Sequence, residues 1–137
     1  MTENYFYENV ENNIIKEDLL TKKALEWAKK FISPQRPQQG PKNPPLTSAQ
    51  LRRFYHDVKA LELKVKNNFE QAKPLIKMLK SKAAYACPTK GRERKVPIEF
   101  REFIEEMVDN IKTEKDFIAF CLVFEAVVGY FYGEGGK

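Results

Sequence analysis

Apolar side chains recur every three or four residues along most of this chain, and this spacing predicts helices. A first helix near residues 14–32 carries an apolar face made of Leu20, Ala24, Trp27, Ala28 and Phe31. A second helix follows the segment LTSAQLRR, where Thr47 or Ser48 can cap it, and Gln50 has the spacing of a capping box with Thr47. Its apolar stripe consists of Leu51, Phe54, Val58, Leu61 and Val65.

A third and a fourth helix follow with the same spacing. The third lies in the segment from about Phe69 to Ala86. We expect its first helical residue to be near Gln71, because Pro74 is tolerated in a first turn. Its expected buried residues are Ala72, Leu75, Ile76, Leu79 and Ala83. The fourth follows a basic loop at 87–97 and turns inward Phe100, Phe103, Ile104, Met107, Val108 and Ile111.

Residues 117–132 form the most apolar stretch of the chain and contain one charged residue, Glu125. Because this stretch is apolar on all sides of a helix, we expect it to be the buried central helix of the fold. At about 16 residues it is shorter than the roughly 20 apolar residues that span a bilayer, so we expect no membrane contact. Glu125 is expected to form an ion pair or hydrogen bond with a basic helix.

These patterns predict an all-α, single-domain bundle of about five helices with a buried C-terminal helix. No run alternates with period two for long enough to suggest a sheet. Residues 33–45 contain five prolines and are expected to be an extended, mobile connector, which would leave the first helix loosely tethered. We therefore divide the chain into an N-terminal helix with its linker, 1–45, and a bundle core, 46–137.

The sequence contains no pattern that encodes catalysis. His56 is the only histidine, the two cysteines Cys87 and Cys121 lie far apart, and no phosphate-binding glycine motif follows a strand. We expect no enzyme activity, no metal and no cofactor. Unmatched cysteines and an acidic, aromatic N-terminus without the features of an export signal predict a reducing, cytoplasmic location.

The net charge of +5 conceals a strong segregation along the chain. Residues 1–20 carry a net charge of −4, residues 21–95 carry +14 and residues 96–137 carry −5. A middle segment this basic is typical of a protein that binds a polyanion such as a nucleic acid. The alternative is a solvated basic surface without a function.

Basic residues also recur at helical spacing beside the apolar stripes. Arg52, His56, Lys59 and Lys66 lie along one side of the second helix, with Arg53 beside them, and Lys73, Lys77 and Lys80 lie along the third. The connecting loop adds Lys90, Arg92, Arg94 and Lys95. No base-reading module accompanies them, so they indicate contacts with phosphate and sugar that are blind to sequence. Arginine suits phosphate best because its planar fork bonds two oxygens.

Four segments together resemble a known family: PLTSAQLRRFY, the Lys-rich helix that ends in AAYA, GRERKVP, and FIAFCLVFEAVVGYFYGEGGK. They are similar to the small subunit of type III-A CRISPR–Cas effector (Csm) complexes, over roughly residues 46–137. The resemblance implies a non-catalytic helical bundle that stacks in several copies along the complex and stabilises the guide RNA–target RNA duplex. It also implies partners, namely guide RNA, target RNA, other subunits of the complex and further copies of this chain.

The resemblance places Arg52 at a family RNA-contact position, and either Arg92 or Arg94 at another, because the 87–95 segment is longer than the usual turn. Arg53, Lys59, Lys82 and Lys90 are added as RNA-contact candidates from the charge pattern. A stand-alone helical protein–protein adaptor is the alternative function. In that case the aromatic C-terminus and the acidic fourth helix would be the functional surfaces.

Overall fold

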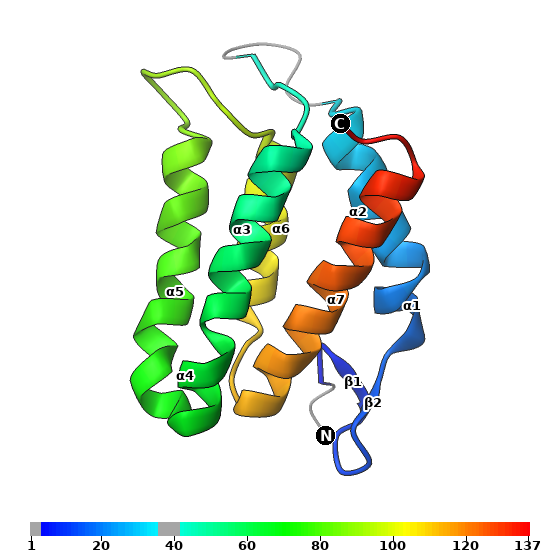
Figure 1. The fold of residues 1–137 in the computed structure, drawn as a ribbon, viewed down its shortest axis with the longest axis vertical. Coiled ribbons are helices and arrows are strands. Elements are labelled where there is room, and N and C mark those ends of the chain that lie inside the picture. Colours follow the sequence, from blue (N-terminus) through cyan, green and yellow to red (C-terminus); the bar gives the residue numbers. More distant parts are fainter. Residues whose placement is uncertain (1–3, 36–41) are drawn as a thin grey trace.

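A computed structural model describes residues 4–35 and 42–137 of the chain. Within these residues the elements are β1 (Tyr7–Asn9), β2 (Ile14–Ile15), α1 (Glu17–Leu20), α2 (Lys22–Ile32), α3 (Ser48–Ala60), α4 (Glu62–Asn67), α5 (Phe69–Ala86), α6 (Ile98–Asp109) and α7 (Glu114–Gly133). The predicted all-α bundle is confirmed, with one small antiparallel hairpin added to it. Figure 1 shows α3 and α7 side by side in front of α6 and α2, with α5 at the edge.

The hairpin corrects the predicted start of the first helix. Ile14 and Ile15 pair with β1 as a strand, and helical structure begins only after Lys16. Asn13 supplies the turn with a left-handed backbone (φ 57°), a conformation that asparagine tolerates better than most residues. Two β-branched residues after such a turn fit a strand better than a helix.

The first long helix, α2, is part of the core rather than a loosely tethered element. Ala24, Ala28 and Phe31 are fully buried, and the Trp27 ring lies 4.9 Å from the ring of Phe103 on α6. The backbone N–H of Leu46 donates a hydrogen bond to the Phe31 carbonyl at 2.9 Å, so the chain returns to the end of α2. Residues 36–41 of the predicted connector lie outside the described residues.

The second predicted helix is split into α3 and α4 at Leu61. Its start is confirmed: Thr47 accepts from the Gln50 backbone, and the Gln50 side chain accepts from the Thr47 backbone. At Leu61 the backbone N–H bonds the Val58 carbonyl, which tightens the turn.

The third helix, α5, begins two residues earlier than expected, at Phe69, and Asn68 caps it by accepting from the Gln71 N–H. Pro74 therefore lies inside the helix, where it cannot donate the usual backbone hydrogen bond. Leu75 was expected to be buried, but it is 36 % exposed.

Helix α7 is the centre of the bundle, as predicted, but only one side of it is buried. Phe117, Phe120, Phe124 and Phe131 are fully buried, whereas Ile118, Leu122 and Tyr132 are 40–44 % exposed along one face. Glu125 lies on that exposed face, so the prediction that it needs a partner is wrong: water solvates it. By length and composition α7 also could cross a membrane, contrary to the sequence estimate, but half of its most apolar window is buried inside the bundle.

Candidate nucleic-acid interface

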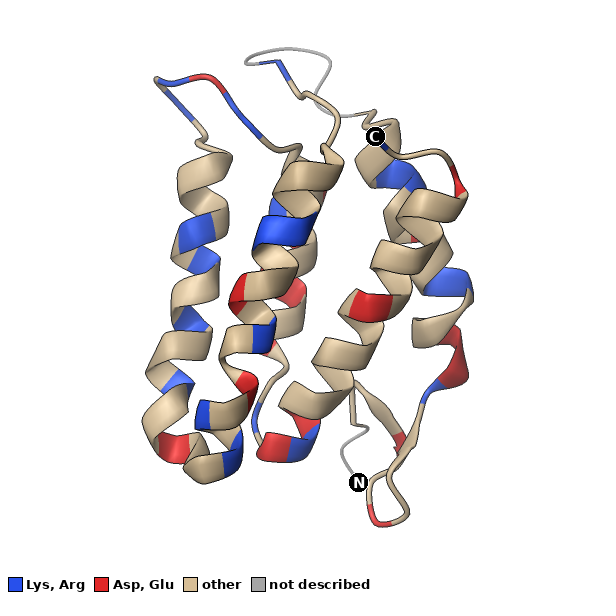
Figure 2. Ribbon diagram, viewed as in Figure 1, with Lys and Arg blue, Asp and Glu red and all other residues tan. Residues whose placement is uncertain are grey.

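Most of the predicted RNA-contact residues meet where α3 begins and α5 ends. The two helices run in opposite directions, and the Lys82 ammonium lies 3.4 Å from the Asp57 carboxylate, which ties α5 to α3. The Gln50 side chain donates to the Lys95 carbonyl at 2.7 Å and so fastens the loop after α5 to the first turn of α3. Figure 2 shows Lys and Arg gathered at this end and along α5.

We call this surface the basic end and define it by its exposed cations: Arg52, Arg53, Lys82, Lys90, Arg92 and Lys95. Arg52 and Arg53 are exposed in the first turns of α3, and neither forms an ion pair with a described acidic side chain. Their positive charge is therefore available to a ligand.

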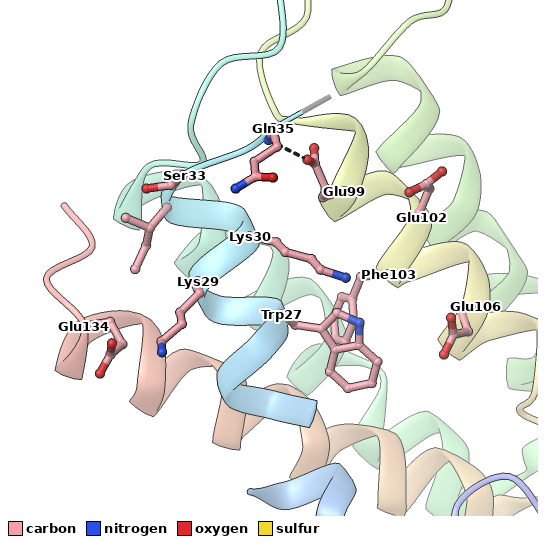
Figure 3. Close-up of a pocket in the computed structure, with 11 residues that line it drawn as sticks. Trp27, Lys29, Lys30, Ser33, Gln35, Glu99, Glu102, Phe103, Glu106 and Glu134 are labelled. Carbon is pink, nitrogen blue, oxygen red and sulfur yellow. Dashed lines mark hydrogen bonds between the residues drawn. The ribbon is translucent and has the colours of Figure 1, made fainter. Parts of the chain in front are cut away.

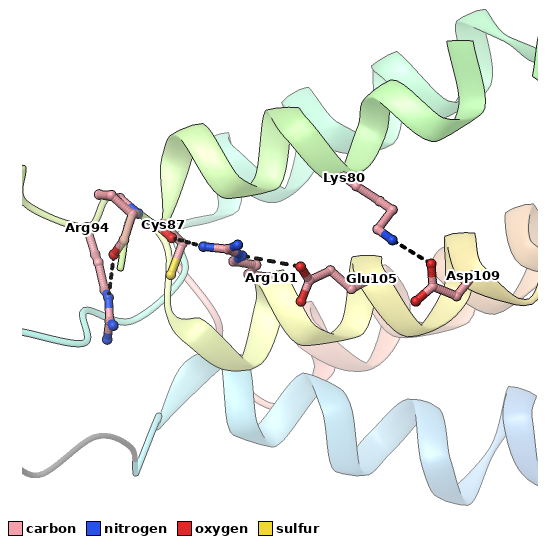
Figure 4. A network of polar contacts seen from close by, with 7 residues as sticks. Lys80, Cys87, Arg94, Arg101, Glu105 and Asp109 are labelled. Atoms are coloured by element: carbon pink, nitrogen blue, oxygen red, sulfur yellow. Dashed lines mark hydrogen bonds and ion pairs between the residues drawn. The ribbon is translucent and has the colours of Figure 1, made fainter. Parts of the chain in front are cut away.

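The loop between α5 and α6 is held in place by its own backbone. The N–H groups of Lys95 and Val96 both donate to the Ala86 carbonyl, at 2.8 and 3.2 Å. Arg101 on α6 donates to the Cys87 carbonyl at 2.9 Å and lies 3.4 Å from Glu105 (Figure 4). Arg101 is not among the predicted site residues, although it is the single cation of an otherwise acidic helix, which was a signal for such a role.

The two arginines of the loop have different environments. Arg94 is half-buried, and its Nε donates to the Pro88 carbonyl at 3.1 Å, so it helps to shape the loop (Figure 4). Arg92 is exposed and its guanidinium lies 4.3 Å from the centroid of the Tyr85 ring, with Nη2 donating to the Tyr85 carbonyl at 3.4 Å. Of the two, Arg92 presents its charge to solvent.

Lys59 lies away from the other candidates. It is in the last turn of α3, about 10 Å along the helix from Arg52, and its ammonium is 2.7 Å from the Glu62 carboxylate. Glu62 raises the pKa of Lys59, and Lys59 in turn lowers the pKa of Glu62. Much of its charge is thus neutralised within the protein, as is that of Lys80, which pairs with Asp109 at 2.6 Å (Figure 4).

A groove of about 660 Å³ between α2 and α6 is a second candidate site (Figure 3). Its floor is the Trp27–Phe103 pair, and its lining includes four carboxylates and two lysines: Glu99, Glu102, Glu106, Glu134, Lys29 and Lys30. Glu99 accepts hydrogen bonds from the Gln35 backbone and the Asn43 amide, at 3.0 and 2.7 Å. Excess negative charge makes this groove unsuitable for a polyanion.

The remaining chemistry of the described residues is structural. Burial and the nearby Glu62 carboxylate raise the pKa of the Cys121 thiol to about 12, and burial raises that of Cys87. Both cysteines are free and buried. Across residues 4–35 and 42–137, no group of three or more His, Cys, Asp or Glu side chains could hold a metal ion.

Comparison with known proteins gives one result that covers nearly the whole chain. Neither the curated proteins nor the solved structures include a match. The family model Csm2 Type III-A matches residues 15–137 and so extends the resemblance seen in residues 46–137 to the first helices. That family is a structural subunit of the effector complex and is not known as a catalytic one. The chain therefore belongs to the Csm2 Type III-A family, the structural small subunit of type III-A CRISPR effector complexes.

Proposed function

We propose that this subunit binds RNA through its basic end, holding the phosphates of the guide RNA–target RNA duplex without reading their sequence. The observation that carries the proposal is the convergence of six exposed cations at one end of the bundle; of these, only Lys82 forms an ion pair with a described acidic side chain. Exposed cations of this kind bind polyanions by releasing counterions, which is insensitive to sequence and weakened by salt.

In this proposal Arg52, Arg53 and Arg92 contact phosphate most directly, because each is exposed and each can bond two oxygens. Lys90 and Lys95 add long-range attraction, and Lys82 adds less because Asp57 pairs with it. Arg94 acts mainly by shaping the loop, and Lys59 contributes little because Glu62 already pairs with it. The subunit performs no chemical step itself and acts in the cytoplasm.

The test is a charge reversal at the basic end, Arg52→Glu with Arg53→Glu. A matched control reverses two exposed lysines on α2, Lys22→Glu with Lys23→Glu, so that the net charge changes equally. Each protein is coexpressed with the other subunits of the complex, and the RNA that copurifies is measured. We expect RNA retention to fall in the first variant and to persist in the control. Equal retention in both variants would refute the assignment of the basic end.

We also propose that copies of the subunit stack along the duplex. Trp27 and Phe31 on the first long helix pack within their own chain, so that helix does not offer them to a second copy. The exposed apolar face of α7, formed by Ile118, Leu122 and Tyr132, is better suited to contact another subunit. Light scattering over a concentration range tests this, with Leu122→Asp expected to reduce association. A strict monomer at every concentration would contradict self-association of the isolated chain.

The acidic groove supports the alternative function, a stand-alone protein–protein adaptor, because its carboxylates and aromatic floor suit a basic peptide. The two functions differ in what copurifies. Salt-sensitive retention of nucleic acid supports the RNA-binding subunit, whereas protein free of nucleic acid, with a partner lost on Glu102→Lys, supports the adaptor.

A further inference from the structure

We propose that Tyr85 and Arg92 form a stacking site for a single unpaired nucleobase of RNA. This inference rests on the proposed function and deepens it, because it assigns to the basic end a contact with a base as well as with phosphates.

The first observation is the exposure of Tyr85. Its side chain is 63 % exposed, which makes it the most exposed aromatic ring among the described residues. It lies in the last turn of α5, directly beside the loop that carries the cations of the basic end. A large aromatic ring left in water at this place offers a flat apolar surface to a ligand.

The second observation is the partner of that ring. The Arg92 guanidinium lies 4.3 Å from the ring centroid, and its Nη2 donates to the Tyr85 carbonyl at 3.4 Å. Arg92 also lowers the pKa of the Tyr85 hydroxyl, chiefly by a side-chain hydrogen bond and then by its charge. Planar guanidinium groups and aromatic rings are the two side-chain surfaces on which unpaired bases stack.

The third observation is that the site is formed before a ligand arrives. The loop that carries Arg92 is fastened at both ends, by the Lys95 and Val96 N–H groups on the Ala86 carbonyl and by Arg101 on the Cys87 carbonyl. Arg92 also lines a hollow of about 470 Å³, in which Lys42 and Arg94 outnumber the one acidic lining residue, Glu93. A preformed site loses less conformational entropy on binding.

The chemistry of the site defines its ligand. Stacking tolerates any base because every base has a π-face, and the surrounding cations bind the adjoining phosphates. Bases inside a duplex are covered by their neighbours, so the site accepts a base from a single strand or from an unpaired position. It therefore distinguishes single-stranded from fully paired RNA, which the phosphate contacts alone cannot do.

The experiment uses the full chain and a short single-stranded RNA that contains 2-aminopurine, whose fluorescence is quenched by stacking. The variants are Tyr85→Ala, Tyr85→Phe, and Leu63→Ala as the control, since Leu63 is an apolar side chain of similar exposure (68 %) but lies on α4, outside both proposed contact surfaces. Circular dichroism verifies that each variant is folded. We expect Tyr85→Ala to lose the quenching and to bind about 5- to 150-fold more weakly, while Tyr85→Phe and Leu63→Ala behave as the original protein.

A further variant separates charge from stacking. Arg92→Lys keeps the charge but removes the planar group, so we expect the salt dependence of binding to persist while the quenching decreases. Quenching that is unchanged in Tyr85→Ala overturns the stacking site. If the Arg52→Glu, Arg53→Glu variant loses binding while Tyr85→Ala binds fully, the stacking site falls and the proposed function stands. If the original protein fails to bind the RNA at low salt, both fall.

Discussion

Replacing Phe124 by alanine tests the buried side of α7. The ring is fully buried and has four aromatic neighbours, with centroid distances of 5.7 Å to Tyr55, 5.8 Å to Phe103, 5.9 Å to Phe120 and 6.5 Å to Phe100. Truncating a buried phenylalanine costs about 3–5 kcal/mol, from lost transfer free energy and from the cavity that remains. The loss of several ring–ring contacts places Phe124 toward the upper end of that range.

The control is Leu122→Ala, two residues earlier on the same helix. Leu122 is 42 % exposed, so its truncation should change the free energy of unfolding by at most about 0.5 kcal/mol. For a domain of this size a loss of 1 kcal/mol lowers the melting temperature by roughly 4 °C. We therefore expect Phe124→Ala to melt about 12–20 °C lower and Leu122→Ala to melt within a few degrees of the original protein.

Urea unfolding followed by far-ultraviolet circular dichroism measures both changes. The slope of the unfolding free energy with urea should stay constant, so that the shift in midpoint reports stability alone. A smaller loss for Phe124→Ala than for Leu122→Ala would refute the orientation of α7 described above. Similar losses in both variants would mean that α7 is buried on all sides, as its composition suggested.

Three further predictions concern the charges and the thiols. Arg52→Glu together with Lys59→Glu should leave helicity and melting temperature nearly unchanged. In RNA-retention assays, Arg52→Glu alone should account for most of the lost RNA, because Lys59 is already paired with Glu62. Asp116→Ala should cost about 1–2 kcal/mol in urea unfolding, because the buried carboxylate accepts two backbone N–H groups at the start of α7. As pH rises from about 9 toward 12, the free energy of unfolding measured in urea should fall. The reason is that the Cys121 thiol ionises in the unfolded chain but stays protonated in the folded one. Replacing Cys121 by serine should reduce this pH dependence.

The helices could be predicted because their signals are local. The start of α3 is encoded by Thr47 and Gln50, two residues three positions apart that form the capping box whatever packs around them. The buried faces of α3 and α6 follow from apolar spacing, since one side of each helix meets the core. These features need no knowledge of the remaining chain.

The errors concern features that depend on neighbours. Composition shows that α7 is apolar on all sides, but the number of helices around it decides that Leu122 is exposed and that Glu125 is solvated. Leu75 on α5 was likewise predicted to be buried but is 36 % exposed. The start of the first helix was wrong because Ile14 and Ile15 continue its apolar pattern, whereas their pairing with β1 makes them a strand.

The candidate site could be located but not ranked from the sequence. Charge spacing identified Arg52 and Arg53, and the structure places them beside the basic loop. Charge spacing could not show that Lys59 is paired with Glu62 or that Arg92 lies over the Tyr85 ring. Each of these side chains has several possible partners nearby, and only the folded structure selects one. The ranking of cations comes only from their partners.

The central position of α7 has a consequence for how the protein is made. The chain leaves the ribosome N-terminus first, so α2 and α3 appear before the helix on which both pack. Between Ile32 at the end of α2 and Glu114 at the start of α7, translation at roughly 5–20 residues per second takes about 4–16 seconds. For that time the apolar faces of the early helices that pack on α7 are left uncovered by it, and a chaperone or an already assembled neighbouring subunit would shield them from aggregation.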